Sequence, residues 1–556
     1  MTDALRLPAG LEGPVAAAIA RAVGERWAER LWARDTSLWT TDPEVAATIA
    51  DRLGWLDAPL QFSERTDELA AFARGVVDEG FERALVCGLG GSSLAPEVLA
   101  MSYPRSAHGL PVGVLDSTDP EAVQAATDAS DPARTLYLIA TKSGTTTETL
   151  SFLAHFWDLE HQLHGHGPES APGEHFVAIT DPGNLEAIDH TEAFRGVYLN
   201  PHDVGGRYSA LTYVGLVPAA ILGLDLDGLL GDARQMADRC TAPDSNNPGV
   251  WLGAVLGALA MEGRDKLTFI IEPSLASLGA WLEQLVAEST GKHGVGIVPV
   301  DGEALGEPGV YGDDRVFVRL GRETAPEDWW VRTGAALDVL SAAGHPVIDL
   351  PLVDGEWLGG EFFRWEFATA IAGAVLGIDP FDEPNVTESK ENTKRVLAES
   401  HASGALPAAA SVGIDDALSV ALRDHVDATV PSGYVAIQAY FAATRDRDAT
   451  LRAVQRAIRD RTRHATTLGY GPRYLHSTGQ LHKGGPPQGR FVQLVAGHAE
   501  DLAIPGGDET FGTLIDAQAL GDVASLEAHH LPVLRIHLGD HPDAGLERLM
   551  TIVSGL

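Results

Sequence analysis

The sequence has little positive charge, few cysteines and no long apolar run. Its 556 residues include 78 acidic and 40 basic ones, a net charge of −38 at pH 7. Nucleic acids and anionic membranes both bind basic surfaces, so we expect neither as a partner. No apolar run reaches membrane-spanning length, and residues 1–10 lack a signal-peptide pattern. Cys87 and Cys240 give neither a disulfide framework nor a metal-ligand spacing, so we expect a cytoplasmic protein without a metal.

Lysine is also scarce, with six residues against 34 arginines. Lys142, Lys390 and Lys483 each lie in a segment rich in Ser, Thr or Gly. In a chain whose cations are mostly arginine, these positions are candidates for sites that need a compact ammonium group. Chance placement is the alternative, because the number is small.

The length suits several domains, and the pattern along the chain indicates an α/β fold. Helical apolar spacing at 15–34, 43–53 and 64–79 predicts a helical N-terminal segment over 1–80. Strands alternating with helices then predict parallel sheets. We place a first α/β domain at 81–230, a second at 231–400 and a C-terminal α/β segment at 401–556. The expected strands are 84–87, 112–115, 136–140, 175–179, 196–199, 267–271, 296–300, 315–319, 346–349, 434–439, 490–494 and 532–537.

The segment 141–150, TKSGTTTETL, is the most informative one. It follows the apolar run LYLIA and precedes an amphipathic helix. Hydroxyls and backbone N–H groups at a helix N-terminus favour an anion. Thr145 and Glu148 also fit a capping box, but a cap needs one hydroxyl and this loop has several. We therefore predict a phosphate-binding loop.

A glycine-rich loop, GLGGSS at 88–93, follows the first expected strand. It suggests a dinucleotide fingerprint with Asp116 as the ribose acid, but Ser93 stands where that fingerprint has its third glycine. Two such loops after neighbouring strands instead indicate one phosphate held at the edge of a parallel sheet.

Two charged residues are candidates for catalysis. Arg207 follows paired glycines in the loop 203–209, where it is suited to stabilising an oxyanion, or is a solvated arginine in a surface turn. Glu288 shares the apolar stripe of a helix with Trp281 and Leu285, ending at Gly291. Burial and the helix C-terminus should raise its pKa towards that of a general base, unless it reaches water.

Two histidine-bearing loops have open assignments. His345 precedes an expected strand and is either an acid–base group or structural. The segment from His476 to Gly485 is polar and glycine-rich, and includes Lys483. We predict that it lies near the phosphate loops, of its own or a partner subunit, and closes over a bound substrate as a lid. The alternatives are a second anion loop, a subunit contact and a purely structural contact with the preceding domains.

Together these segments resemble the glucose-6-phosphate isomerase family. Five motifs occur in the family's order and span about residues 80–400: GLGGSSLAPE at 88–97, TKSGTTTET at 141–149, GGRYS at 205–209, ESTGK at 288–292 and FDEPNVTESK at 381–390. The resemblance implies two sugar-isomerase-type domains, a homodimer, no cofactor and interconversion of glucose 6-phosphate and fructose 6-phosphate.

The resemblance also implies a role for each matching residue. Glu288 would move a proton between C1 and C2, Arg207 would stabilise the enediolate, and Lys390 would assist a sugar hydroxyl or the ring oxygen. His345 lies in the interval expected for the ring-opening histidine. Gly91 and Gly206 would border the sugar. The phosphate would be held by Ser92, Thr141, Lys142, Ser143, Thr145 and Thr146.

Some positions depart from the family pattern. Where the family has FDQxGVExxK, this chain has Glu383, Asn385 and Thr387, and Gly144 replaces a bulkier loop residue. The segments PNVTESK and YLHSTGQLHKGG are most similar to the isomerase portion of bacterial fused transaldolase/glucose-6-phosphate isomerases. Another sugar phosphate as substrate therefore stays open, as does a non-catalytic sugar-phosphate sensor, which would need neither Glu288 nor Arg207.

Overall fold

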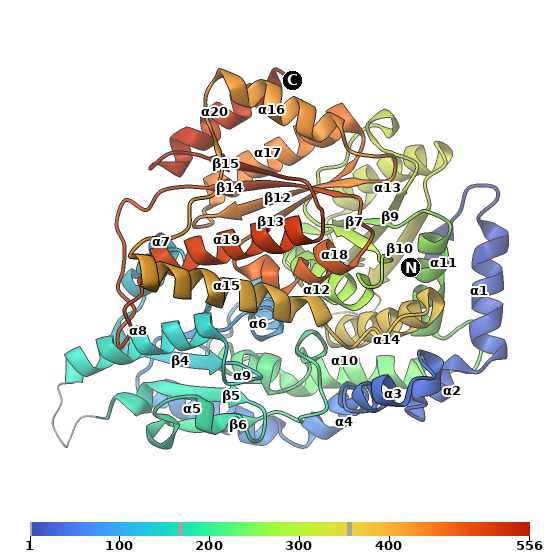
Figure 1. Cartoon of the computed structure of the whole chain (residues 1–556). Helices are drawn as coiled ribbons and strands as arrows, with labels where there is room; N and C mark the ends of the chain where they lie inside the picture. Colours follow the sequence, from blue (N-terminus) through green and yellow to red (C-terminus); the bar gives the residue numbers. More distant parts are fainter. Residues whose placement is uncertain (1–2, 165–170, 353–357) are drawn as a thin grey trace.

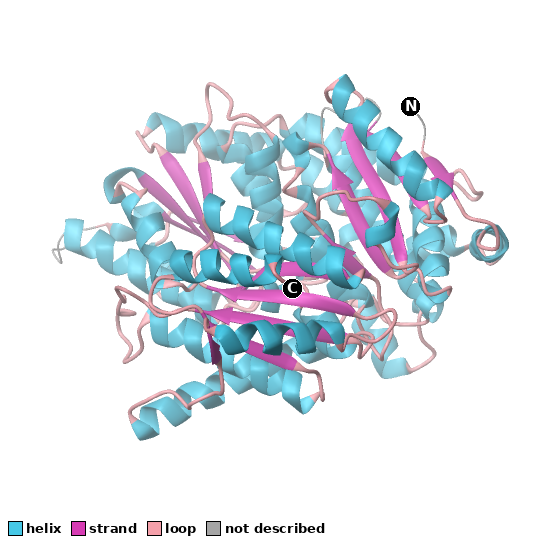
Figure 2. Ribbon diagram, turned by 90° about the horizontal axis from the view of Figure 1, so that it is seen from above, coloured by secondary structure: helices cyan, strands magenta, loops and turns pink. Residues whose placement is uncertain are grey.

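The computed structural model describes residues 3–164, 171–352 and 358–556. Three five-stranded sheets, each flanked by helices, make up the molecule (Figure 1, Figure 2). The predicted α/β class with parallel sheets is confirmed. Within these described ranges, none of the helices combines the length and the apolar content needed to cross a bilayer.

The first sheet has the strand order β3-β2-β4-β5-β6, and all its neighbouring strands are parallel. Every residue of β4 is buried, as expected for a continuous apolar run covered on both faces. The apolar runs predicted all five strands to within two residues. The strands are β2 (Arg83–Cys87), β3 (Val112–Leu115), β4 (Thr135–Ala140), β5 (Phe176–Thr180) and β6 (Gly196–Leu199), and the helices between them are α6 (Gly91–Ser102), α7 (Pro120–Asp128) and α8 (Thr147–His164).

The second sheet has the order β1-β10-β9-β7-β8, in which β1 alone is antiparallel. Its strands are β1 (Ala4–Arg6), β7 (Lys266–Ile271), β8 (Val298–Val300), β9 (Arg315–Arg322) and β10 (Val347–Leu352). The helices of this part are α9 (Tyr213–Ile221), α10 (Leu226–Arg239), α11 (Pro248–Met261), α12 (Leu278–Thr290), α13 (Glu327–Ala342) and α14 (Gly359–Leu376).

The third sheet, β11-β15-β14-β12-β13, is wholly parallel. Its strands are β11 (Val412–Gly413), β12 (Tyr434–Tyr440), β13 (Ala465–Tyr470), β14 (Gly489–Val495) and β15 (Val533–His537). Helices α15 and α19 lie side by side between this sheet and the first one (Figure 1). The helices here are α15 (Pro384–Ser403), α16 (Asp416–Asp427), α17 (Arg445–Thr462), α18 (Gly479–Gly484), α19 (Phe511–Ala528) and α20 (Pro542–Ser554).

The N-terminal segment differs from the helical prediction in two ways. Residues 4–6 form β1, which pairs with β10 of the second sheet. The helix expected over 15–34 is interrupted at Arg26, which has a left-handed backbone with φ of 58°. The helices here are α1 (Glu12–Gly24), α2 (Trp27–Trp32), α3 (Pro43–Ala50), α4 (Ala58–Ser63) and α5 (Thr66–Asp78).

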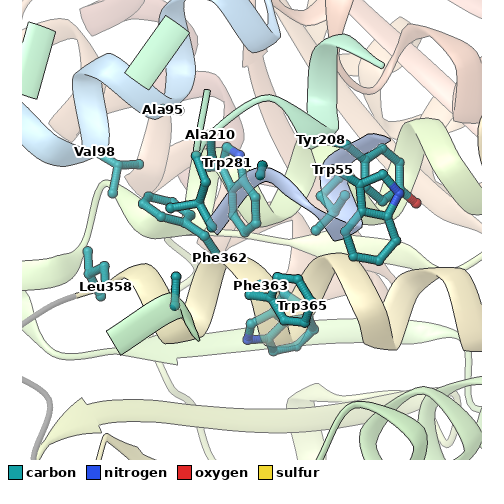
Figure 3. Packing of buried hydrophobic residues seen from close by; sticks show 14 of the residues in the cluster. Trp55, Ala95, Val98, Tyr208, Ala210, Trp281, Leu358, Phe362, Phe363 and Trp365 are labelled. Carbon is teal, nitrogen blue, oxygen red and sulfur yellow. The ribbon is translucent and has the colours of Figure 1, made fainter. Parts of the chain in front are cut away.

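The largest hydrophobic core joins the N-terminal helices to α6, α12 and α14. Figure 3 shows Trp55 beside Tyr208, with ring centroids 5.4 Å apart, and Trp281 against Phe362 at 4.8 Å. Tyr208 follows Arg207 and Trp281 lies on the helix of Glu288. The core therefore fixes the two segments that carry the predicted catalytic residues.

We expect Phe362→Ala to destabilise the protein by about 3–5 kcal/mol, because it leaves a cavity beside Trp281 in a fully buried layer. The measurement is the midpoint of urea unfolding. Val331→Ala on α13, where Val331 is 63% exposed, is the control and should change stability by less than about 0.5 kcal/mol. Equal midpoints for the two variants would show that this layer does not govern unfolding.

Candidate active site

A cavity of about 450 Å³ lies at the carboxyl ends of β2, β4, β5 and β6, facing α12 and α15. This is the edge at which open parallel sheets bind ligands. The cavity receives residues from the N-terminal segment, from the parts of the chain that form the first and second sheets, and from the C-terminal segment. Its charged and imidazole-bearing residues are Asp51, Arg52, Lys142, Asp181, His202, Arg207, Glu288, Glu383, Lys390 and His476.

Most of the residues singled out in the sequence meet in this cavity. Thr145 lines a smaller adjoining hollow of about 90 Å³, which shares Thr146, Lys390 and His476 with the main cavity. His345 lines neither. The predicted residues that line the main cavity are Gly91, Ser92, Thr141, Lys142, Ser143, Thr146, Gly206, Arg207, Glu288 and Lys390.

The hydroxyl-rich loop precedes the N-terminus of α8. The Thr141 and Thr146 hydroxyls lie 3.0 Å apart across it, and the Thr145 N–H donates to Ser143 Oγ. Gly144 has φ of +68°, and a Cβ there would come within 2.4 Å of the Asn184 carbonyl oxygen. Glycine therefore suits this position, although the family usually has a bulkier residue there.

Two glycines let the surrounding segments approach the glycine-rich loop. A Cβ on Gly91 would lie 2.1 Å from the Gly206 carbonyl oxygen, so these two loops touch through their backbones. A Cβ on Gly90 would lie 2.6 Å from the His476 carbonyl oxygen, and Gly90 has φ of +57°. Only residues without a side chain allow this three-way contact.

Arg207 is buried in the wall of the cavity and fully engaged. Its Nε donates to Ser289 Oγ at 2.8 Å, and Nη2 donates to two backbone carbonyls near the start of α15. Nη1 donates to Glu383 at 3.0 Å and lies 3.2 Å from Glu288 Oε1. Burial opposes the charge, but the two facing carboxylates outweigh it and raise the pKa of Arg207.

Glu288 is buried and held on both sides. Gln284, one turn earlier on α12, donates from Nε2 to Glu288 Oε2 at 3.0 Å. Burial raises the pKa of Glu288; Arg207 opposes that rise, and Glu383 adds to it by repulsion. A carboxyl with a raised pKa, facing a cavity beside a fixed positive charge, has the properties of a general base.

Lys142 links the hydroxyl-rich loop to the Arg207 loop. Its ammonium forms an ion pair with Asp181 and donates to the carbonyl oxygens of His202 and Val204. Gly54, in the N-terminal segment, donates its N–H to the carbonyl oxygen of Asp203 in the same loop as Arg207. Lys142 therefore holds the hydroxyl-rich loop against the Arg207 loop, and Asp181 neutralises the charge of the Lys142 ammonium.

Comparisons with known proteins point to one family. The family model "Phosphoglucose isomerase" matches residues 48–314. The chain is 30% identical to a glucose-6-phosphate isomerase of Rubrobacter xylanophilus, over 63% of this chain and 90% of that protein. It is also 30% identical to a glucose-6-phosphate isomerase of Thermus thermophilus, over 62% of this chain and 90% of that protein.

The chain belongs to the glucose-6-phosphate isomerase family.

Solved structures agree with this membership at the level of the fold. A hypothetical protein of Thermus thermophilus superposes with a TM-score of 0.57 at 27% identity, covering 71% of this chain and all of that one. A glucose-6-phosphate isomerase of Chlamydia trachomatis has a TM-score of 0.51 at 20% identity, covering 67% of this chain and 78% of that chain. The family model ends at residue 314, so it covers the first sheet together with β7 and β8 of the second.

His345 lies away from the family's cavity. It is 4% exposed and packs against Tyr311 and Phe317, with ring centroids 6.1 and 5.5 Å away. Burial lowers its pKa. Since neighbours within its own chain cover it, the structure does not bring His345 together with Glu288 and Lys390.

His476, unlike His345, lines the main cavity. It lies in the 3₁₀ turn η10 (Arg473–His476), and its Nε2 is 3.0 Å from Glu148 Oε1. Glu148 also accepts a hydrogen bond from Gln518 Nε2 at 2.7 Å. The sequence suggested Glu148 only as a capping residue, and Gln284, Asp181 and Gln518 carried no signal at all, because their partners lie far away in the chain.

Lys483 does not reach the cavity. Its ammonium forms an ion pair with Asp522 at 2.7 Å, and both side chains are almost fully buried. The segment 476–485 therefore touches the site through His476, while its lysine is a structural contact. Among the described residues, no group of three or more His, Cys, Asp and Glu is arranged to hold a metal ion.

We expect Thr146→Ala to weaken binding of inorganic phosphate about tenfold or more, since a hydroxyl donor to a charged group is worth about 1.5–3 kcal/mol. Isothermal titration calorimetry with phosphate measures this. Thr48→Ala, at an exposed position on α3, is the control. Unchanged affinity in Thr146→Ala would mean that the loop only caps α8.

Proposed function

We propose that this chain interconverts glucose 6-phosphate and fructose 6-phosphate. One observation carries the proposal: buried Glu288 lies 3.2 Å from Arg207 in a cavity that the hydroxyl-rich loop also lines. A base, a fixed cation and an anion-binding loop in one cavity suit proton transfer on a phosphorylated substrate.

In this proposal the phosphate binds where α6 and α8 begin. Ser92, Ser143 and Thr146 line the cavity there, and Thr141 lies within hydrogen-bond distance of Thr146. The dipoles of the two helices add to the attraction. Holding the phosphate fixes the distance of C1 and C2 from Glu288.

Glu288 takes the proton from one of these carbons and returns it to the other. The intermediate enediolate carries negative charge, which the buried guanidinium of Arg207 stabilises without reorganising. Lys390, at the exposed end of the cavity on α15, contacts a sugar hydroxyl or the ring oxygen. The proposal includes no metal or organic cofactor.

A non-catalytic sugar-phosphate sensor is the rival function. It would keep the phosphate loop but has no use for a buried glutamate next to a buried arginine. Burying both charges costs free energy, which favours a catalytic reason for their presence. Isomerisation of a different sugar phosphate remains a variant of our proposal, because Glu383 departs from the family pattern and its carboxylate accepts a hydrogen bond from Arg207.

Three further assignments rest on the sequence resemblance and are proposals as well. The segments PNVTESK and YLHSTGQLHKGG support a relation to the isomerase portion of fused transaldolase/glucose-6-phosphate isomerases. The family resemblance supports a homodimer, which analytical ultracentrifugation tests. The two unpaired cysteines, both buried, support a reducing cytoplasm.

We expect Glu288→Gln to lower turnover by about a hundredfold or more, the usual loss for a missing acid–base group. The assay couples fructose 6-phosphate conversion to glucose 6-phosphate detection, with a chelator present. Glu283→Gln on the same helix is the matched control, because Glu283 lines a different cavity. Near-normal turnover in a folded Glu288→Gln protein would contradict the assignment.

The pH dependence of turnover should reflect Glu383. Glu288 must be ionised to act, so turnover falls as the pH drops through its pKa, which lies above the ordinary 4.5. Glu383 raises that pKa by repulsion and also shares Arg207. Removing its charge in Glu383→Gln should lower the pKa and move the acid limb of the kcat profile to lower pH.

The control for this shift is Glu399→Gln, which removes a carboxylate that is 49% exposed near the end of α15. It should leave the acid limb in place. A limb that moves upwards in Glu383→Gln, or moves equally in both variants, would exclude Glu288 as the titrating group.

A further inference from the structure

One buried lysine close to the helix of Glu288 has no role in the function proposed above. Lys292 follows Gly291, the C-cap of α12, and only 1% of its surface is exposed. It ends the ESTGK motif and is one of six lysines in the chain. Since a lysine is almost never fully buried unless its ammonium is paired, its position requires partners nearby.

The ammonium of Lys292 binds the segment that leads into α15. Its Nζ donates to the Asp379 carbonyl oxygen at 2.6 Å, a residue 87 positions further along the chain. It also forms an ion pair with Asp382 Oδ1 at 2.6 Å. The side chain of Asp382 is 34% exposed, so one partner of this buried cation reaches water. Lys292 thus connects the end of α12 to the residues that precede α15.

Arg207 holds the same segment through other atoms. Its Nη2 donates to the carbonyl oxygens of Pro380 and Asp382, each at 2.9 Å. Backbone carbonyls of one short segment therefore accept hydrogen bonds from two buried cations. The segment continues into Glu383 and then α15, on which Lys390 lies, and both of these residues line the cavity. The two cations together fix where α15 begins.

Holding two cations in one buried region has a cost. Burial opposes the charge on Lys292 and Arg207 repels it, and these effects lower the pKa of Lys292 to about 8, although Asp382 and Asp379 act in the opposite direction. The charged groups that face Lys292 are Arg207 of the loop 203–209, Glu288 of α12, and Asp379 and Asp382 before α15. The ammonium is therefore present below about pH 8 and lost above it.

The charge of Lys292 also acts on the proposed base. Burial raises the pKa of Glu288, and the positive charge of Lys292 is one of the effects that oppose this rise. Lys292 itself does not line the cavity, whereas Glu288, Arg207 and Glu383 do. Lys292 can therefore influence a substrate only through residues that contact the cavity.

We propose that Lys292 is a positioning residue of the isomerase site, whose ammonium holds the start of α15 so that Glu383 and Lys390 face the cavity. Loss of the proton removes the ion pair with Asp382, and the segment then keeps only one of its two cations. Turnover should accordingly fall as the pH rises through about 8. This inference rests on the proposed isomerase function and adds a group that touches no substrate.

The test is the pH profile of kcat for the conversion of fructose 6-phosphate to glucose 6-phosphate. Lys292→Met, which has no charge, should lower kcat by about tenfold to a hundredfold, because small displacements of reacting groups have effects of that size. Its acid limb should move to higher pH, since Glu288 loses a neighbouring positive charge. Its affinity for inorganic phosphate, measured by calorimetry, should change by less than about twofold, because the phosphate loops follow strands of the first sheet.

Two further variants separate the charge from the fold. Lys292→Arg keeps a positive charge throughout the assay range, so it should leave the acid limb in place and abolish the fall near pH 8. Asp382→Asn removes the anion that favours the ammonium, so it should move the basic limb to lower pH. Because Asp382 is partly exposed, this variant remains informative even if the substitutions at Lys292 do not fold.

Lys266→Met is the matched control. Lys266 is also fully buried and paired, with Asp265 at 2.6 Å, but it lies at the start of β7 and does not line the cavity. It should lower the midpoint of thermal unfolding without moving either limb. A basic limb that stays in place in Asp382→Asn, or limbs that move equally in Lys266→Met, would overturn the role of Lys292. A wild-type protein without isomerase activity would instead refute the proposed function.

Discussion

The buried guanidinium of Arg207 is the constraint on which the site depends. A charge removed from water must be paired and hydrogen-bonded, and removing one partner of such a pair typically costs about 3–5 kcal/mol. Arg207 finds its partners on α12 and at the start of α15, segments that lie far from it in the sequence. Satisfying this one side chain therefore brings the first sheet, the helix of Glu288 and the segment of Lys390 to one place.

The glycine contacts extend the same constraint to the C-terminal segment. Gly91 lies against the Gly206 carbonyl, and Gly90 lies against the His476 carbonyl. In each contact two backbones touch with no side chain between them, which fixes the spacing of the two segments. Gln284 then connects His476 to Glu288 by two hydrogen bonds from one nitrogen. Segments that follow strands of all three sheets thus form one cavity wall. Polar groups held in place in this way suit preorganised electrostatic catalysis.

The sequence predicts the elements whose signals are local. Continuous apolar runs mark buried parallel strands, and the loops after β2 and β4 carry their own motifs. It misses β13, whose residues ATTLGY are too polar to stand out, and β11, which has only two residues. It also misses β1, whose three residues pair with a strand more than 340 positions away. The sequence marks Glu148 as a capping residue, since its partners His476 and Gln518 are visible only after folding. Position along the chain points to His345, whose packing against Tyr311 and Phe317 is likewise visible only after folding.

The charge balance of the cavity bears on the proposed phosphate site, which consists mainly of hydroxyl groups. Four cationic side chains line it, Arg52, Lys142, Arg207 and Lys390, and four carboxylates line it too, Asp51, Asp181, Glu288 and Glu383. Three of the cations, Arg52, Lys142 and Arg207, are paired with those carboxylates. A strong local positive charge is therefore absent from the described walls of this cavity, in a chain of net charge −38. Fixed dipoles remain, namely the threonine and serine hydroxyls and the N–H groups at the starts of α6 and α8. Such groups bind a phosphate without attracting the proton away from Glu288, which a nearby uncompensated cation would do by lowering its pKa.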